Sequence, residues 1–161
     1  MGYVTMDWIV IRIMEIKPEQ IRLDLDVASY REALGQLCSD FKSQGLVDGE
    51  YYEEILNREQ HYPTGFKFSS VGVAIPHTDY NPYKKHGIMV ARLKLPVFVR
   101  RIDVPSQEIP VSFILLTLPD AGRDQLDFLM NTISIFKNES KVKVLETTQN
   151  VELMADILNG R

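Results

Sequence analysis

The amino-acid sequence predicts an α/β protein of a single domain, with a mixed β-sheet flanked by helices on both faces. Apolar residues recur at helical spacing between residues 30 and 41 and again after residue 125, whereas the part between contains several apolar runs of strand length. Helices on either side of a group of strands are typical of layered α/β proteins. A chain of 161 residues is also of a size that one hydrophobic core can organise.

The first predicted helix begins near Tyr30, because the apolar residues that follow fall on one helical face. These residues are Tyr30, Ala33, Leu34, Leu37, Cys38 and Phe41. Ser29 is a candidate N-cap, and Glu32 three residues later completes a capping box. Cys38 is the only cysteine, so a disulfide within the chain and a multi-cysteine zinc site are excluded, and we expect a packing role for its thiol.

A shorter helix is expected after Asp48-Gly49, a dipeptide typical of turns. Its apolar residues Tyr52, Ile55 and Leu56 should face the core. The next segment, residues 61–70, is rich in turn-forming residues and has no clear period. We therefore interpret it as a loop.

Three apolar runs in the middle of the chain are predicted strands. They are residues 72–75, residues 88–99 with a bend or a sheet edge at Pro96, and residues 111–118. The last run, VSFILLTL, is almost entirely apolar, so we expect a central strand that is covered on both faces.

Two further helices are predicted after the strands. The first has Leu126, Leu129, Met130, Ile133 and Phe136 at helical spacing, and the second has Val151, Met154, Ile157 and Leu158. The pattern does not determine the order of the strands in the sheet.

The first 20 residues are interpreted as an N-terminal extension or arm, which leaves residues 21–161 as the domain. The apolar run at residues 8–14 is interrupted by Arg12 and is shorter than the roughly 20 residues that span a bilayer, so we expect no direct membrane insertion. A net charge of −4 argues against a nucleic-acid surface. With a single cysteine, a reducing cytoplasm is the simplest location.

The stretch GVAIPHTDY, residues 72–80, places His77 directly after an apolar run and a proline. An imidazole is partly neutral at cellular pH and can act as a nucleophile, and Pro76 restricts the backbone before it. The alternative is a histidine that only packs at a loop, which is the commoner case for an isolated Pro-His dipeptide. The spacing of His61, His77 and His86 fits no zinc motif, so no metal site is expected.

Three segments in order, Arg58-Glu59, Pro63-Thr64-Gly65 and Gly72 to His77, resemble the enzyme IIA family of the bacterial phosphoenolpyruvate-dependent sugar phosphotransferase system, of the fructose and mannitol superfamily. The resemblance extends from about residue 23 to residue 158. The triplet TGF and the tetrapeptide PHTD look most like galactitol-type members. The resemblance implies a phosphotransferase in which His77 accepts a phosphoryl group from the carrier protein HPr and passes it to a IIB component, without a metal or organic cofactor.

The resemblance also assigns a role to Arg58, whose guanidinium can hold two phosphoryl oxygens. Without the motif, Arg58 would be interpreted as a surface ion pair. Thr64 either donates its hydroxyl to the phosphoryl group or stabilises the loop. Asp79 either orients a ring nitrogen of His77 or is a turn residue.

Gln125 stands where fructose- and mannitol-type members commonly carry a second histidine. Its amide can donate a hydrogen bond to a phosphate but carries no positive charge, which leaves more of the charge stabilisation to Arg58. By resemblance we expect the ring nitrogen of His77 farther from the backbone to be phosphorylated. Two other functions stay open: a regulatory protein whose phosphorylation state is sensed by a partner, and a scaffold without phosphoryl chemistry.

Overall fold

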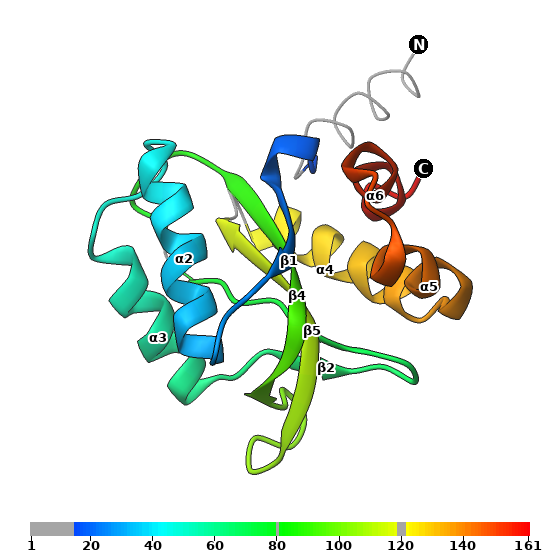
Figure 1. Cartoon of the computed structure of the whole chain (residues 1–161). Coiled ribbons are helices and arrows are strands. Elements are labelled where there is room, and N and C mark those ends of the chain that lie inside the picture. The colour runs from blue at the N-terminus through cyan, green and yellow to red at the C-terminus, as the bar shows by residue number, and fades with distance from the viewer. Residues whose placement is uncertain (1–14, 80, 119–121) are drawn as a thin grey trace.

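The computed structural model describes residues 15–79, 81–118 and 122–161 (Figure 1). Its strands are β1 (Ile21–Leu25), β2 (Gly65–Lys67), β3 (Gly72–Ala74), β4 (Gly87–Arg100) and β5 (Glu108–Leu118). Its helices are η1 (Pro18–Gln20), α2 (Tyr30–Ser43), α3 (Tyr51–His61), α4 (Gly122–Phe136), α5 (Glu139–Thr147) and α6 (Val151–Leu158). Within these residues, no helix combines the length and apolar character needed to cross a membrane.

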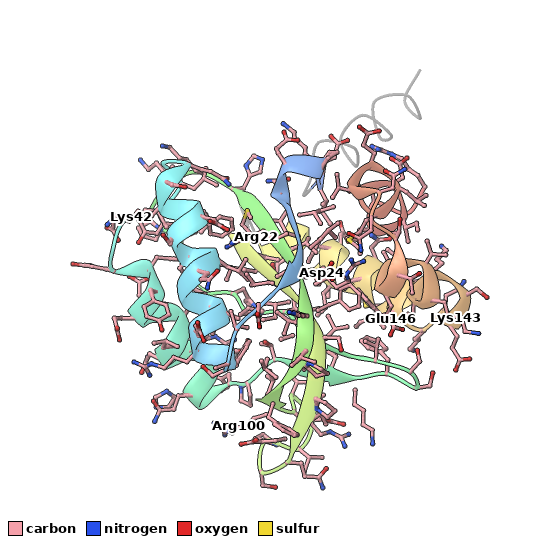
Figure 2. All side chains as sticks on the ribbon, viewed as in Figure 1. Arg22, Asp24, Lys42, Arg100, Lys143 and Glu146 are labelled. Carbon is pink, nitrogen blue, oxygen red and sulfur yellow. The ribbon has the colours of Figure 1, made fainter. Side chains whose placement is uncertain are left out.

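The five strands form one mixed sheet in the order β1-β4-β5-β3-β2. Helices α2 and α3 cover one face, whereas α4, α5 and α6 cover the other (Figure 1). Side chains fill the space between the sheet and each helical layer (Figure 2), and they form two apolar clusters, one on each face. The predicted α/β class, with helices on both faces of a mixed sheet, is confirmed.

Helix α2 has the predicted cap and the predicted face. The Ser29 hydroxyl accepts the Glu32 N–H at 3.1 Å, and the Glu32 carboxylate accepts the Ala28 N–H at 2.8 Å. Five of the six apolar residues are buried, and Tyr30 is half-buried. Cys38 is among the buried residues, and this burial raises the pKa of its thiol to about 12. The thiol therefore has little nucleophilic character at neutral pH.

Helix α3 turns a different row of residues toward the core than the sequence predicted. Tyr51 and Ile55 are fully buried, whereas Tyr52 and Leu56 are only partly covered. The buried row continues to Glu59. Its three members are four residues apart, so they share one face of the helix, and the last of them is a carboxylate. Apolarity alone did not reveal that row.

Helix α4 also differs from its predicted face. Leu126 and Met130 are exposed, and the helix buries Phe128, Ile135 and Phe136 against the sheet. The apolar residues of this helix exceed what one face can bury, and the surplus lies in solvent.

Four elements were not predicted: η1, β1, β2 and α5. Strand β2 lies inside the segment interpreted as a loop and pairs antiparallel with β3. It has only three residues, too few to display a period. Residues 1–14 of the predicted N-terminal arm lie outside the described residues. The part that follows contacts the domain, because Ile16 is buried and its backbone N–H and C=O each bond to the Asn159 side chain at 2.8 Å.

The prediction for β5 is confirmed, since this strand lies between β4 and β3 and its last six residues are all buried. Pro96 lies at a register irregularity between Arg92 and Val97 of β4, in the part that extends beyond the pairing with β1, as expected for an edge or a bend.

Strands β3 and β5 are parallel, with Val73 opposite Phe113 and Ala74 opposite Ile114. Their carboxyl ends therefore lie side by side at one edge of the sheet. The Thr117 N–H donates to the Pro76 carbonyl at 3.0 Å and continues this pairing past the end of β3. Consequently the residues that follow β3 and the first turns of α4, which follows β5, come together there.

Candidate active site at the ends of strands β3 and β5

His77 lies three residues beyond the end of β3, on a segment whose backbone is held from two sides. The Ile75 N–H donates to the Thr64 carbonyl at 3.3 Å, and the Pro76 carbonyl accepts from Thr117. Ile75 itself is buried. The imidazole therefore leaves the sheet from a fixed backbone.

The ring of His77 is oriented by its own segment. Its Nδ1 lies 3.0 Å from the Ile75 carbonyl oxygen. Because a carbonyl can only accept, Nδ1 must carry the hydrogen, and in a neutral ring the lone pair is then on Nε2. Burial lowers the pKa of His77, the hydrogen bond to Ile75 opposes this effect, and the nearby Arg58 charge adds to it. The ring is therefore neutral at physiological pH, and its lone pair is on Nε2.

Arg58 lies in the last turn of α3 and is held on several sides. Its Nε and Nη2 donate to the two carboxylate oxygens of Asp79 at 3.2 and 3.3 Å. Its Nη1 donates to the Tyr62 carbonyl at 3.3 Å, and the guanidinium lies 4.6 Å from the centroid of the Tyr62 ring. Arg100, at the end of β4 (Figure 2), donates to the Gln60 carbonyl at 2.7 Å and ties this end of α3 to the sheet. A cation is thus fixed beside the imidazole.

Asp79 is placed on Arg58, while the ring nitrogen of His77 that a carboxylate would orient is bonded to Ile75. The sequence offered Asp79 as a partner of the imidazole, because a carboxylate two residues away can reach it. The Ile75 carbonyl fills that role, and the carboxylate instead accepts from one edge of the Arg58 guanidinium. Asp79 is 75% exposed and Arg58 is 21% exposed, so the carboxylate is on the solvent side of the pair.

Thr64 is buried and its hydroxyl donates to Glu59 Oε1 at 2.7 Å. The Tyr30 hydroxyl donates to the same oxygen. Of the two roles considered for Thr64, this contact corresponds to stabilisation of the loop. Burial raises the pKa of Glu59, although the two hydroxyl donors counteract this effect. Within the part of the chain that the structure describes, Glu59 Oε2 has no hydrogen-bond partner.

Glu59 is part of the Arg58-Glu59 motif, but the sequence assigned it no role. Glu59 follows Tyr51 and Ile55 on α3 at a spacing of four residues, so it lies in the buried row. A carboxylate in a buried row requires hydrogen-bond partners, and this spacing could have revealed it. The Tyr30–Glu59–Thr64 cluster connects α2, α3 and the segment before β2. It thereby stabilises the helix end that carries Arg58.

Gln125 reaches the same edge of the sheet from α4. Its Oε1 accepts the Thr117 hydroxyl at 3.3 Å, and the Thr117 backbone bonds to Pro76. With Oε1 occupied, the amide nitrogen of Gln125 is the part that can donate to an anion. The site therefore combines an imidazole, a guanidinium and a neutral donor.

Three exposed apolar side chains lie on the elements that carry these polar groups. Tyr62, Leu126 and Met130 are 65%, 56% and 59% exposed. Tyr62 stacks on Arg58. On α4, Leu126 follows Gln125 directly and Met130 lies one turn further along the helix. In the described part of the chain, no three His, Cys, Asp or Glu side chains form a group that could hold a metal ion.

Comparisons with known proteins identify relatives along nearly the whole chain. The family described as "Phosphoenolpyruvate-dependent sugar phosphotransferase system, EIIA 2" matches residues 14–160. The galactitol-specific EIIA component of Escherichia coli K12 is 21% identical over 133 residues, which cover 83% of this chain and 88% of that protein. The multiphosphoryl transfer protein of Shigella flexneri is 35% identical over 81 residues, which cover 49% of this chain and 9% of that protein.

Solved structures share the fold. The enzyme IIA of the mannitol system of E. coli, solved in complex with its phosphorylated enzyme IIB, has a TM-score of 0.72 at 20% identity and covers 92% of this chain and 100% of its own. The nitrogen regulatory protein IIA-Ntr of Neisseria meningitidis has a TM-score of 0.69 at 26% identity and covers 88% of this chain and 97% of its own.

Proposed function

Because the chain belongs to the EIIA type 2 family of the phosphoenolpyruvate-dependent sugar phosphotransferase system, we propose that it carries a phosphoryl group on His77 between two protein partners. The donor is phosphorylated HPr, and the acceptor is a IIB component. The observation that carries this proposal is the orientation of His77, whose Nδ1 is bonded to Ile75 so that Nε2 is left as the nucleophile.

In the proposed reaction, Nε2 of His77 attacks the phosphorus of the donor phosphohistidine. The new N–P bond forms as the N–P bond of the donor breaks, and the electron pair of the broken bond returns to the donor ring. Nδ1 keeps its proton and its bond to Ile75. Arg58 stabilises charge on the phosphoryl oxygens, and the amide of Gln125 is a further donor. The second transfer, to IIB, repeats these steps with His77 as the leaving group.

The exposed apolar residues around the site support successive protein partners. A protein that binds its partners transiently needs a docking surface that is apolar enough to bind each partner and small enough to let it dissociate. Tyr62, Leu126 and Met130 supply exposed apolar area next to Arg58 and Gln125. We propose that HPr and IIB contact these residues in turn, and that both meetings take place in the cytoplasm.

The likeness to galactitol-specific EIIA components favours a galactitol-type system as the destination of the phosphoryl group. The sugar itself is contacted by the membrane component of such systems, so the choice of substrate depends on which IIB protein accepts from His77.

A regulatory function is the alternative, because the nitrogen regulatory IIA-Ntr protein of N. meningitidis shares the fold at 26% identity. In that case a partner senses the phosphorylation state of His77 and no sugar is transported. Both functions use the same chemistry at His77. They differ in whether a IIB nucleophile accepts the phosphoryl group.

Phosphoenolpyruvate labelled with ³²P, enzyme I and HPr provide the test. We expect acid-labile label on the wild-type protein and none on His77→Ala, whereas His86→Ala, which removes an exposed histidine, should label normally. Equal labelling of the His77 variant would refute the assignment. Addition of a galactitol-type IIB protein should then remove the label from the wild type, and retention of the label would favour the regulatory alternative.

A further inference from the structure

We propose that Asp79 is a positioning residue that holds Arg58 in the unphosphorylated protein, releases it to the phosphoryl group, and thereby limits how far transfer to His77 proceeds. This inference rests on the proposed function. Asp79 touches neither the nucleophile nor a reacting atom, and it acts through Arg58.

The contact between Asp79 and Arg58 has the geometry of an anion site that is already filled. Two carboxylate oxygens bind Nε and Nη2, which are the two nitrogens that form one edge of the guanidinium. Two oxygens of a phosphoryl group would bind the same edge in the same way. The third nitrogen of the guanidinium, Nη1, donates to the Tyr62 carbonyl. Phosphoryl group and carboxylate therefore compete for one pair of donors.

The two side chains differ in how easily they can move. Arg58 is bonded to the Tyr62 carbonyl and stacked on the Tyr62 ring, and it is 21% exposed. Asp79 is 75% exposed, so its carboxylate can turn into water and be solvated there. An exposed ion pair of this kind contributes little to stability. When an anion arrives at His77, the exchange therefore displaces Asp79 and leaves Arg58 in place.

Both charges act on the imidazole. Apart from the lowering by burial, Asp79 raises and Arg58 lowers the pKa of His77. A phosphoryl group bonded to Nε2 places negative charge near the Asp79 carboxylate, which already acts on the imidazole. The displaced carboxylate therefore repels the phosphoryl group. The Asp79 carboxylate thus disfavours the phosphorylated form in two ways. It loses its ion pair with Arg58, and it repels the phosphoryl group. This keeps the phosphoryl group easy to pass on.

The test is the equilibrium of phosphoryl exchange between HPr and this protein, measured with Asp79→Asn. The amide keeps the size of the side chain but loses its charge, so the equilibrium should shift about two- to fivefold toward the phosphorylated protein. Phosphorylation should also become slower, because Arg58 is less well held before the transfer. Asp79→Glu restores the charge and should return the equilibrium toward the wild-type value.

A matched control is available at Asp103, which binds Arg101 by the same two-point contact and is 60% exposed. Asp103→Asn should leave the exchange equilibrium unchanged. If the wild type is phosphorylated on His77 and Asp79→Asn has the wild-type equilibrium, or shifts it toward phospho-HPr, the role of Asp79 is refuted while the proposed function stands. If the wild type takes no phosphoryl group, the proposed function itself fails.

Discussion

Arg92 of β4 and Asp24 of β1 form a two-point ion pair in which the arginine is buried, with N–O distances of 3.1 and 3.3 Å. Asp24 has a φ of 54° and lies at the register shift between β1 and β4, so the local backbone is shaped around this contact. Arg92 Nη1 also donates to the carbonyls of Leu145 and Thr148 at the end of α5. One guanidinium therefore joins two strands and a helix, near Asp24 in Figure 2.

Arg92→Met should lower the free energy of unfolding by about 1–3 kcal/mol, because it leaves the buried Leu145 carbonyl and the Thr148 carbonyl without this donor, whereas Asp24 is half exposed and keeps the Gln149 amide as a donor. Urea denaturation followed by circular dichroism gives this value. Arg22→Met is the control, since Arg22 pairs with Asp40 at the surface and should cost at most about 1 kcal/mol. Similar losses in the two variants would contradict the role of burial.

The protonation of His77 should occur in acid. Burial holds its pKa below the ordinary value of 6.5, although the bond to Ile75 and the charge of Asp79 oppose this effect. The protonated ring has no lone pair on Nε2, so the rate of phosphorylation should fall in acid with a midpoint below pH 6.5. An NMR titration of the ring carbons measures the midpoint directly. A midpoint above 6.5 would contradict the lowered pKa.

Glu59 should make stability depend on pH in the opposite sense to most carboxylates. Its pKa is raised in the folded protein by burial, so the folded state binds the proton more tightly than the unfolded state. The stabilisation is complete below the unfolded value of about 4.5 and is lost as pH rises through the folded value. Glu59→Gln carries no charge, so its stability relative to the wild type should increase with pH in this window.

Unfolding free energies of the wild type and Glu59→Gln at several pH values provide the measurement. Two parallel profiles would show that Glu59 does not change its protonation between the folded and unfolded states. Tyr30→Phe removes one donor from the same oxygen and should raise the pKa of Glu59 further, which extends the window of pH dependence upward.

Gly72 occupies a place where a side chain cannot fit. A Cβ there would lie 2.1 Å from the Pro110 carbonyl oxygen, which belongs to the backbone of β5 and cannot move aside. Gly72→Ala should therefore separate β3 from β5 and destabilise the protein by about 1–3 kcal/mol or more. It should also slow phosphorylation, because β3 leads into the segment that carries His77. In the control Gly35→Ala, the nearest side-chain atom of Tyr52 lies 3.5 Å away, and the helix should gain about 0.5–1 kcal/mol.

The sequence predicted the elements whose apolar pattern is long and uninterrupted. Helix α2 and strand β5 each bury a continuous set of apolar residues, and such a set is visible without knowledge of any partner. Strand β2 has three residues, and α5 buries only Val142 and Leu145, so neither produces a period. These elements are stabilised by pairing and packing against segments far along the chain.

The same distinction applies to the candidate site. The positions of His77 and Arg58 follow from short motifs, which local sequence contains. The contacts of Asp79 and Glu59 join residues 21 and 29 positions apart, and they depend on how the helices pack on the sheet. The position of Asp79 two residues after His77 therefore gave no indication that its partner would be Arg58.

The exposed apolar surface next to Gln125 gives a prediction about partner docking. Met130 lies on α4 one turn after Leu126 and is 59% exposed, although it could have been polar at no cost to the core. If HPr docks on this surface as proposed, Met130→Lys should raise the KM for phospho-HPr about tenfold and leave kcat nearly unchanged, because a docking side chain contacts the partner and not the phosphoryl group. Leu153→Lys, at an exposed position of α6, is the control and should change neither constant. A lower kcat with an unchanged KM would instead place Met130 in the transfer step, because a residue that only docks the partner acts equally on the ground state and the transition state.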